Sequence, residues 1–368
     1  MVQDEAAELR VSTLELFFDL VFVFTVTQLT QVLSHDLHPR GLLHATLILL
    51  VVWWMYDGYC WLTNSVPPDR LSRRLVLLAG MAAFLLAAMA LPRAFGDGGV
   101  AFGLAYLLIN ALHALLYSRT TVGSDPLRAV LRFGPLNLAA ALLVLGAGFV
   151  HGWPRTALWL GAVGVHVLIP YVSRIGGLAM RAGHIVERHG LVVIIALGEA
   201  VVAIGLGAEG RPVGSRLALV AVLGLALAAC LWWVYFGGDD DRAAVALESV
   251  GGSRRTILVL NAYAYTHVAI LLGVVCVATG MKRAIAHPGA ALPWGHAVAL
   301  SGGVALFLGG ELAFRAVLRL GRLAPRLVAL PVLVATAVAG RAAAGWQLSA
   351  LVAVLTVLFA AEEMTNQP

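Results

Sequence analysis

The chain has 368 residues, of which 60% are hydrophobic and only 12% carry a charged side chain. A soluble domain carries about 25% charged residues, so this composition leaves too little polar surface to cover a water-soluble globule. The formal charge of +5 comes without a long basic run or a basic stripe, which argues against a nucleic-acid partner. The sequence therefore predicts an integral membrane protein whose main partner is the lipid bilayer.

Hydrophobic segments long enough to cross a bilayer recur along the whole chain. A spanning helix needs about 20 mostly apolar residues, and roughly ten to twelve segments meet that requirement. Twelve can be drawn, at 12–34, 41–64, 71–92, 99–119, 126–149, 156–174, 184–207, 214–236, 254–280, 292–318, 323–341 and 345–361. Gly, Pro or charged residues fill most of the gaps. The predicted fold is all-α, a polytopic transmembrane helical bundle of about 12 spans, with 10 as the lower bound.

The basic residues are unevenly distributed between the predicted loops. An even number of spans places both termini on one side of the membrane, and about two thirds of the 25 Lys and Arg residues fall on that side. Loops rich in Lys and Arg stay in the cytoplasm. We therefore expect cytoplasmic N- and C-termini.

Two stretches of the chain resemble each other and indicate an internal repeat. VVWWMYDGYCWLTN (51–64) and CLWWVYFGGDDDRA (230–243) both place a Trp-Trp pair and a Tyr before an acidic exit that contains glycine. Upstream, Glu15 and Glu187 take corresponding positions. We interpret the chain as two parallel six-helix repeats, residues 1–180 and 181–368, the second ending in a short C-terminal tail. Chance recurrence in a biased composition is the alternative.

Two carboxylates lie four residues apart in the first hydrophobic segment. Glu15 and Asp19 share one face of a helix, because successive helical residues are about 100° apart. Charge is costly in hydrocarbon, so an ionisable residue in a spanning helix points to a functional site such as a pore, a proton site or a gate. The alternative is structural, with Glu15 at the membrane interface and Asp19 held by an arginine or a helix N-terminus.

Asp57 is a third carboxylate at a similar depth. It lies about two turns before the end of the second segment, which we expect to be the cytoplasmic end. Asp57 and Asp19 are therefore candidates for one pathway.

The stretch HIVERHGLVVIIALGEAVVAIG (184–205) is the second focus. His184, Arg188 and Glu199 fall in one sector of a helix, and Glu199 lies at mid-membrane or beyond. Arg188 is about 16 Å from Glu199 along the axis, too far for a direct pair. Glu199 is either a protonatable or cation-coordinating carboxylate or a neutral Glu bonded to a neighbouring helix.

A further group of ionisable residues lies at the ends of later segments. Glu311 and Arg315 are four residues apart, a spacing typical of a local ion pair, with a transport role as the alternative. Asp239, Asp240 and Asp241 form an acidic exit that we expect to be solvated.

Several kinds of chemistry lack a motif in this sequence. The histidines have no metal-ligand spacing, and GxxxxGK[ST], HExxH and GxSxG are absent. We therefore expect no metal site, no cofactor and no catalytic residue. An enzyme of another kind stays open, although a non-enzymatic protein is the preferred interpretation.

The stretches ELFFDLVFVF and ERHGLVVIIALGEAVVAIG resemble the two best-marked stretches of the bacterial low-temperature-requirement A (LtrA) family. The resemblance covers nearly the whole chain and implies a multi-pass protein of the bacterial cytoplasmic membrane, named from a cold-growth phenotype, without a known reaction or substrate. Glu15, Asp19, Glu187 and Glu199 occupy positions in those stretches. A weaker similarity is to two-repeat potassium channels, whose Phe-Ser-Asp element is replaced here by Phe17-Phe18-Asp19.

Three functions follow from these observations. The first is a transport-class protein with a cation or proton pathway through the two-repeat bundle, in which Glu15, Asp19, Asp57, Glu187, Arg188, Glu199 and Glu311 bind or conduct. The second is a membrane-embedded enzyme or lipid-handling factor in cold adaptation. The third is a structural or signalling membrane protein whose carboxylates hold helices together. A homo-oligomer is compatible with each.

Overall fold

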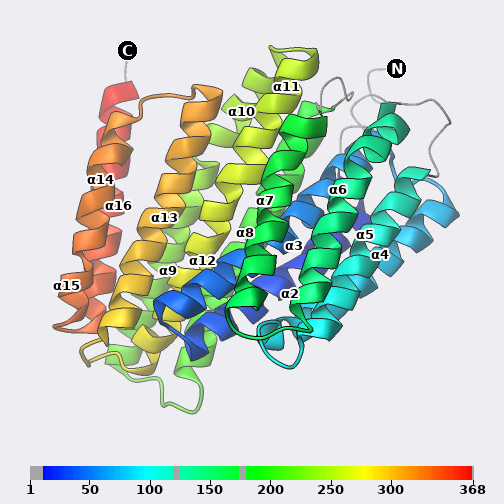
Figure 1. Cartoon of the computed structure of the whole chain (residues 1–368). Helices are drawn as coiled ribbons and strands as arrows, with labels where there is room; N and C mark the ends of the chain where they lie inside the picture. The colour runs from blue at the N-terminus through cyan, green and yellow to red at the C-terminus, as the bar shows by residue number, and fades with distance from the viewer. Residues whose placement is uncertain (1–10, 119–124, 174–179, 367–368) are drawn as a thin grey trace. The chain divides into compact units, whose positions relative to one another are not determined.

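The fold is described from a computed structural model, which covers residues 11–118, 125–173 and 180–366. The side chains of residues 125–130, 173, 365 and 366 are not described either. Arg10, Arg119 and Arg174, which contribute to the predicted orientation, lie outside the described residues. Within these ranges the regular structure is helical and contains no strand, which confirms the predicted all-α fold class (Figure 1).

The helices follow the predicted segments closely. They are α2 (Thr13–His35), α3 (Pro39–Ser65), α4 (Leu71–Ala90), η1 (Leu91–Arg93), α5 (Gly99–Ser118), α6 (Asp125–Ala147), α7 (Trp153–Ser173), α8 (Ala182–Ala208), α9 (Ser215–Phe236), α10 (Asp239–Glu248), α11 (Gly252–Val259), η2 (Leu260–Tyr265), α12 (Thr266–Ala286), α13 (Trp294–Leu318), α14 (Ala324–Ala335), α15 (Ala337–Gly340) and α16 (Ala344–Asn366).

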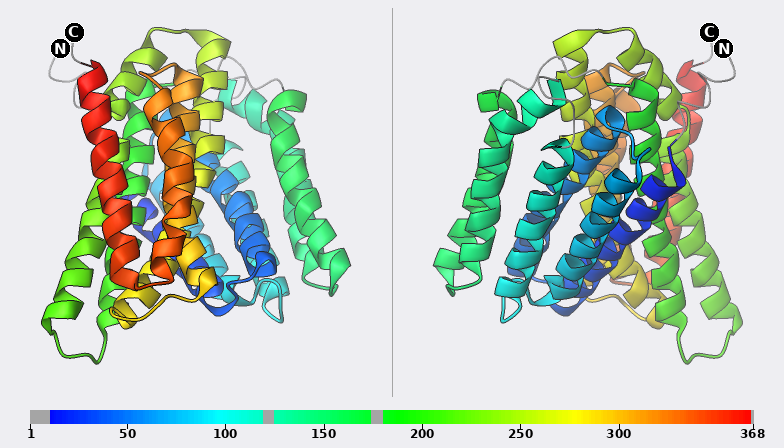
Figure 2. Two further views of the ribbon diagram at one scale, coloured as in Figure 1. Left: turned by 90° about the vertical axis from the view of Figure 1, so that its left-hand side faces the viewer. Right: turned by 90° about the vertical axis from the view of Figure 1, so that its right-hand side faces the viewer.

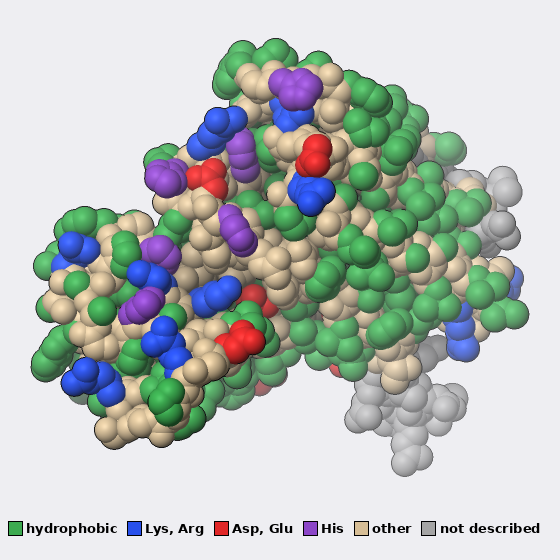
Figure 3. All heavy atoms as spheres, turned by 90° about the horizontal axis from the view of Figure 1, so that it is seen from below, with side chains coloured by type: hydrophobic (Ala, Val, Ile, Leu, Met, Phe, Trp, Pro, Cys, Tyr) green, Lys and Arg blue, Asp and Glu red, His purple; other side chains and the backbone are tan. Residues whose placement is uncertain are grey.

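Ten helical stretches within the described residues are long and apolar enough to cross a membrane. Two shorter apolar helices, Leu131–Ala147 and Ala324–Gly340, add to them, so the predicted range of spans is confirmed. Apolar side chains such as Leu71, Leu131 and Val328 are more than two-thirds exposed. Figure 3 shows hydrophobic side chains over much of the surface in view. Such a surface is suited to lipid, so the protein is a multi-pass membrane protein.

Two local features differ from the expectation. The acidic exit after residue 237 forms the helix α10, and Asp239 in its first turn is 1% exposed, so the expectation of a solvated Asp239 is wrong. The segment predicted at 254–280 contains the π-helical turn η2. A π-turn adds a residue to the helical repeat and changes which side chains face a neighbour.

The described helices form two compact units. Unit 1 comprises Met1–Leu29, Leu43–Val192 and Ala244–Ala264, and unit 2 comprises Thr30–Leu42, Val193–Ala243 and Tyr265–Pro368. Each unit is described below by itself. The division into repeats 1–180 and 181–368 stays a prediction.

Unit 1 holds a series of helices that pack on their neighbours in sequence, α4 on α5, α5 on α6 and α6 on α7. Gly103 in α5 allows a close approach to α6, because a Cβ atom there would lie 2.5 Å from the Cα atom of Leu145. Without a hydrophobic driving force between helices in lipid, small residues at such crossings favour packing. This bundle provides the walls of the cavity described below.

Unit 2 is built around the pair α12 and α13. A Cβ atom at Gly273 would lie 2.7 Å from the backbone nitrogen of Phe307, and one at Gly303 would lie 2.7 Å from that of Val277. The two helix backbones therefore touch at both positions. Figure 2 shows α14 (orange) and α16 (red) side by side within the same unit.

Candidate functional site

One face of α2 is buried in unit 1 and carries both predicted carboxylates. Glu15, Phe18 and Asp19 are at most 3% exposed, whereas Phe17 on the other side is half exposed. The Ser12 N–H and hydroxyl donate to Glu15 Oε2 at 3.0 and 2.8 Å, and the Glu15 N–H donates back to Ser12 Oγ at 3.3 Å. This capping box fixes Glu15 in the first turn and leaves its other oxygen for the interior.

Arg188 of α8 lies between the two carboxylates. Its Nη2 is 2.7 Å from Asp19 Oδ1, and its Nη1 is 3.5 Å from Glu15 Oε1. One turn earlier in α8, His184 Nε2 is 3.1 Å from the same Glu15 oxygen. Glu15 and Asp19 are one turn apart on α2, and His184 and Arg188 are one turn apart on α8, so the two pairs of side chains face each other. All four side chains are buried. We call these four residues, together with Tyr56, the Arg188 cluster.

Helix α3 is the third helix of the cluster and contributes Tyr56. The Tyr56 hydroxyl donates to Asp19 Oδ1 at 2.6 Å. Its ring packs on Phe22 with centroids 4.1 Å apart, and the Arg188 guanidinium carbon lies 5.9 Å from its centroid. The aromatic contacts hold the hydroxyl in place, so one Asp19 oxygen is bound by both a hydroxyl and a guanidinium.

Asp57 belongs to a neighbouring pair. Its Oδ1 is 3.1 Å from His189 Nε2, while His189 Nδ1 is 2.9 Å from the carbonyl oxygen of Ile185. Both neighbours of the ring are acceptors, so the ring is fully hydrogen-bonded when both nitrogens carry a proton. Asp57 and the carbonyl group of Ile185 therefore hold the His189 ring from both sides.

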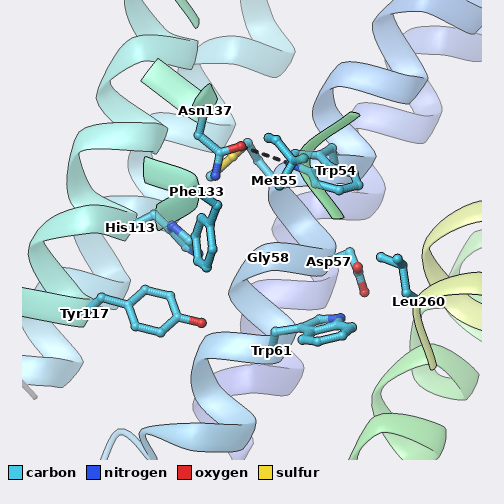
Figure 4. A pocket seen from close by; sticks show the side chains of 11 residues that line it. Trp54, Met55, Asp57, Gly58, Trp61, His113, Tyr117, Phe133, Asn137 and Leu260 are labelled. Carbon is cyan, nitrogen blue, oxygen red and sulfur yellow. Dashed lines mark hydrogen bonds between the residues drawn. The ribbon is translucent and has the colours of Figure 1, made fainter. Parts of the chain in front are cut away.

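Asp57 also lines a cavity in unit 1 (Figure 4). The cavity offers about 50 Å³ to the centre of a water molecule. Its wall consists of Trp54, Met55, Asp57, Gly58, Trp61, His113, Tyr117, Phe133, Asn137, Ile169 and Leu260. Trp54 Nε1 donates to Asn137 Oδ1 at 3.1 Å across one side. The wall is therefore mainly apolar, with several aromatic rings and one carboxylate.

Unit 2 contains a second buried network, which we call the arginine network. Its members come from α10, α13, α14 and α16: Asp239, Glu311, Arg315, Arg326 and Glu362.

Two arginines connect the carboxylates of the arginine network. Arg315 lies 2.6 Å from both Asp239 and Glu362, and Arg326 reaches Glu362 at 2.9 Å, Asp239 at 3.3 Å and Glu311 at 3.4 Å. Each of these carboxylates thus has an arginine partner.

The sequence comparisons agree with the resemblance seen in the motifs. The family model described as "Bacterial low temperature requirement A protein (LtrA)" matches residues 10–361. The chain belongs to the bacterial LtrA family. It is also 30% identical to an uncharacterized protein, RA0937, of Rhizobium meliloti (strain 1021), over 84% of this chain and 78% of the relative.

In this LtrA family member the predicted site residues separate into groups. Glu15, Asp19 and Arg188 come together, and Asp57 lies in the neighbouring pair with His189. Glu187 lies on the exposed side of α8, where its Oε2 accepts a hydrogen bond from the backbone of Val11.

The two remaining predicted residues lie in unit 2. Glu199 is buried, about 16 Å beyond Arg188 along α8 by helical rise. Glu311 belongs to the arginine network through Arg326, and the ion pairs of Arg315 are with Asp239 and Glu362. The expected local pair between Glu311 and Arg315 is therefore replaced by bonds to other helices.

Sequence reasoning did not assign Tyr56 and His189 to the site. One signal for Tyr56 is its position directly before Asp57. A second is the helical spacing i, i+3 and i+7, which places Tyr56 on one face of α3 with Trp53 and Cys60. All three side chains are at most 1% exposed. A buried apolar face that includes one hydroxyl needs a polar partner, which here is Asp19.

Proposed function

We propose that this LtrA family member is a transport-class membrane protein in which the Arg188 cluster, with Asp57 and His189 beside it, takes up and releases a proton or a small cation. The observation that supports this proposal is the set of ionisable side chains, Glu15, Asp19, His184 and Arg188, all buried at ion-pair distance in membrane-spanning helices. Buried ionisable groups of this kind occur in proton relays and ion pathways.

The charge balance of the cluster supports exchange. Two carboxylates face one arginine, which stays protonated, so the charges balance only when a proton resides on His184 or on one carboxyl group. Burying an uncompensated charge in a low-dielectric interior costs several kcal/mol. A cation that binds near the cluster would therefore replace this proton, and its release would let the proton return.

The hydrogen bonding of the cluster also leaves capacity for a ligand. Asp19 Oδ2 and Arg188 Nε are buried and have no hydrogen-bond partner within the described protein. A buried polar atom without a partner costs about 1–3 kcal/mol, so native proteins rarely retain one without a use. A proton or cation on Asp19 Oδ2 would satisfy one of the two atoms.

Orientation belongs to the same proposal. We propose a bacterial cytoplasmic membrane location with both termini in the cytoplasm, on the basis of the distribution of Lys and Arg between loops. Reporter fusions at the C-terminus that are active only in the cytoplasm are expected. A reporter that is active only outside the cytoplasm would show that the proposed orientation is wrong.

Flux through purified protein in liposomes tests the proposal. A proton gradient and gradients of Na⁺ and K⁺ are applied, and wild-type protein is expected to conduct above the lipid background for at least one ion. Asp19→Asn should reduce that flux at least tenfold. Asp97→Asn makes the same chemical change at a side chain that is 76% exposed and should leave the flux unchanged. No flux of any of the three ions in the wild-type protein would refute the proposal.

A lipid-handling role is the second candidate, and one feature of unit 2 favours it. A groove of about 600 Å³ lies between α14 and α16 and is lined by Ala, Val, Leu and Pro side chains, with Arg322 at the end where α14 begins. An acyl chain fits such a wall, and Arg322 suits an anionic headgroup. Co-purified anionic phospholipid that is lost in Arg322→Gln would support this role, and unchanged lipid content would count against it.

A further inference from the structure

The cavity beside Asp57 has a specific construction. Trp54, Asp57, Gly58 and Trp61 stand at i, i+3, i+4 and i+7 and therefore form one face of α3. Residues of helices α5, α6 and α7 and of the turn η2 line the other sides. At about 10–15 Å³ per water centre, 50 Å³ gives space for roughly three to five waters, or for an organic ion of similar size.

The wall presents ring faces and one carboxylate. Tyr117 and Phe133 meet edge to face with centroids 5.9 Å apart, and Trp54 and Trp61 stand on the α3 side. The faces of aromatic rings carry negative charge and attract cations, most strongly when water is excluded. Asp57 Oδ1 also faces His189 Nε2 at 3.1 Å, so together with Asp57 the rings make the cavity suited to a positive charge when His189 is neutral.

One buried polar atom of the wall, Trp61 Nε1, lacks a hydrogen-bond partner within the described protein, and its side chain is 8% exposed. Gly58 keeps the space beside the imidazole open, since a Cβ atom there would lie 3.3 Å from His113 Nε2. An indole N–H requires an acceptor, and a ligand hydroxyl would supply one.

We propose that this cavity binds a small organic ammonium ion, held by the Asp57 carboxylate and the surrounding rings. A bare metal ion would find one carboxylate and few other hard ligands, whereas an alkylated ammonium group makes its contacts with ring faces. The inference deepens the proposed function and rests on it for the role of Asp57. Its test measures binding without a membrane gradient, so the binding site and the proposed ion flux can be refuted separately.

The test compares a cation with its neutral isostere. Choline and 3,3-dimethylbutan-1-ol have the same shape and hydroxyl and differ in charge. Isothermal titration calorimetry on the detergent-purified full chain is expected to give choline at least tenfold tighter binding than the alcohol. Asp57→Asn should remove most of that preference. Equal binding of the two probes, or no choline binding to the wild-type protein at millimolar concentration, would overturn the proposal.

A pair of glycine substitutions covers the case in which Asp57→Asn fails to fold. Gly58→Ala places a methyl group beside His113 and is expected to weaken choline binding severalfold. Gly164→Ala changes a helical glycine of the same unit with no atom within 4 Å of the new Cβ and should leave binding unchanged. Equal choline affinity in Gly58→Ala and the wild-type protein would place the ligand elsewhere and refute this site. Binding without ion flux would leave this inference standing while refuting the proposed function.

Discussion

The two units each bury a charged network, and the networks differ in composition. The Arg188 cluster has one arginine for two carboxylates and includes a histidine and a tyrosine. The arginine network has two buried arginines for three carboxylates, and its bonds join four helices near their ends. Both networks contain carboxylates, but the Arg188 cluster also includes His184, a side chain whose ordinary pKa lies near neutral pH. We therefore expect proton exchange at the Arg188 cluster and a role in fixing helices for the arginine network.

The repeated Trp-Trp-x-Tyr stretch shows the same contrast. Trp53 is 1% exposed and donates to the carbonyl oxygen of Ala264, whereas Trp232 is 40% exposed. Tyr56 binds a carboxylate, and Tyr235 in the equivalent position lies 2.9 Å from His267 Nε2. Similar sequence therefore serves a buried charged site in unit 1 and a less polar contact in unit 2.

The largest effect on stability is expected for Arg326→Ala. The change removes the ion pair of Glu311 with Arg326 and one partner from both Asp239 and Glu362. Breaking a buried ion pair on one side costs about 3–5 kcal/mol. The midpoint of thermal unfolding in detergent measures this loss. Arg322→Ala, at an exposed arginine near the start of the same helix, is the control and should unfold close to wild type. Equal midpoints for the two variants would contradict a fixing role.

A smaller effect is expected for Tyr56→Phe. The ring contacts stay, and only the 2.6 Å bond to Asp19 is lost. A hydrogen bond to a charged group contributes about 1.5–3 kcal/mol. Thermal unfolding should show this loss, and ion flux should change as well, because the bond fixes Asp19. A variant with wild-type stability and flux would exclude Tyr56 from the cluster.

The smallest effect is expected for Tyr235→Phe. Its hydroxyl lies 2.9 Å from the imidazole of His267, and a typical hydrogen bond contributes about 0.5–1.5 kcal/mol. Unfolding should shift slightly, and flux per folded molecule should not change. A loss of flux larger than that of Tyr56→Phe would assign the functional site to unit 2 and reverse the comparison.

The sequence predicted the helices well because hydrophobic length and helix-breaking residues are local signals. That Glu15 and Asp19 share one face of α2 also followed from their spacing of four residues, whereas the burial of that face did not. The partners did not follow, because the contact between Arg188 and Asp19 joins residues far apart in the chain. Asp239 was misjudged for the same reason, since its burial depends on arginines of α13 and α14.

Ion flux per folded molecule in liposomes, compared between Asp19→Asn and Glu362→Gln, tests the central claim most directly. Both substitutions remove one carboxylate charge from a buried network, the first in unit 1 and the second in unit 2. The account predicts that Asp19→Asn loses at least nine-tenths of the flux, while Glu362→Gln is less stable but conducts normally once the amount of folded protein is matched. Equal flux in the two matched samples would contradict it.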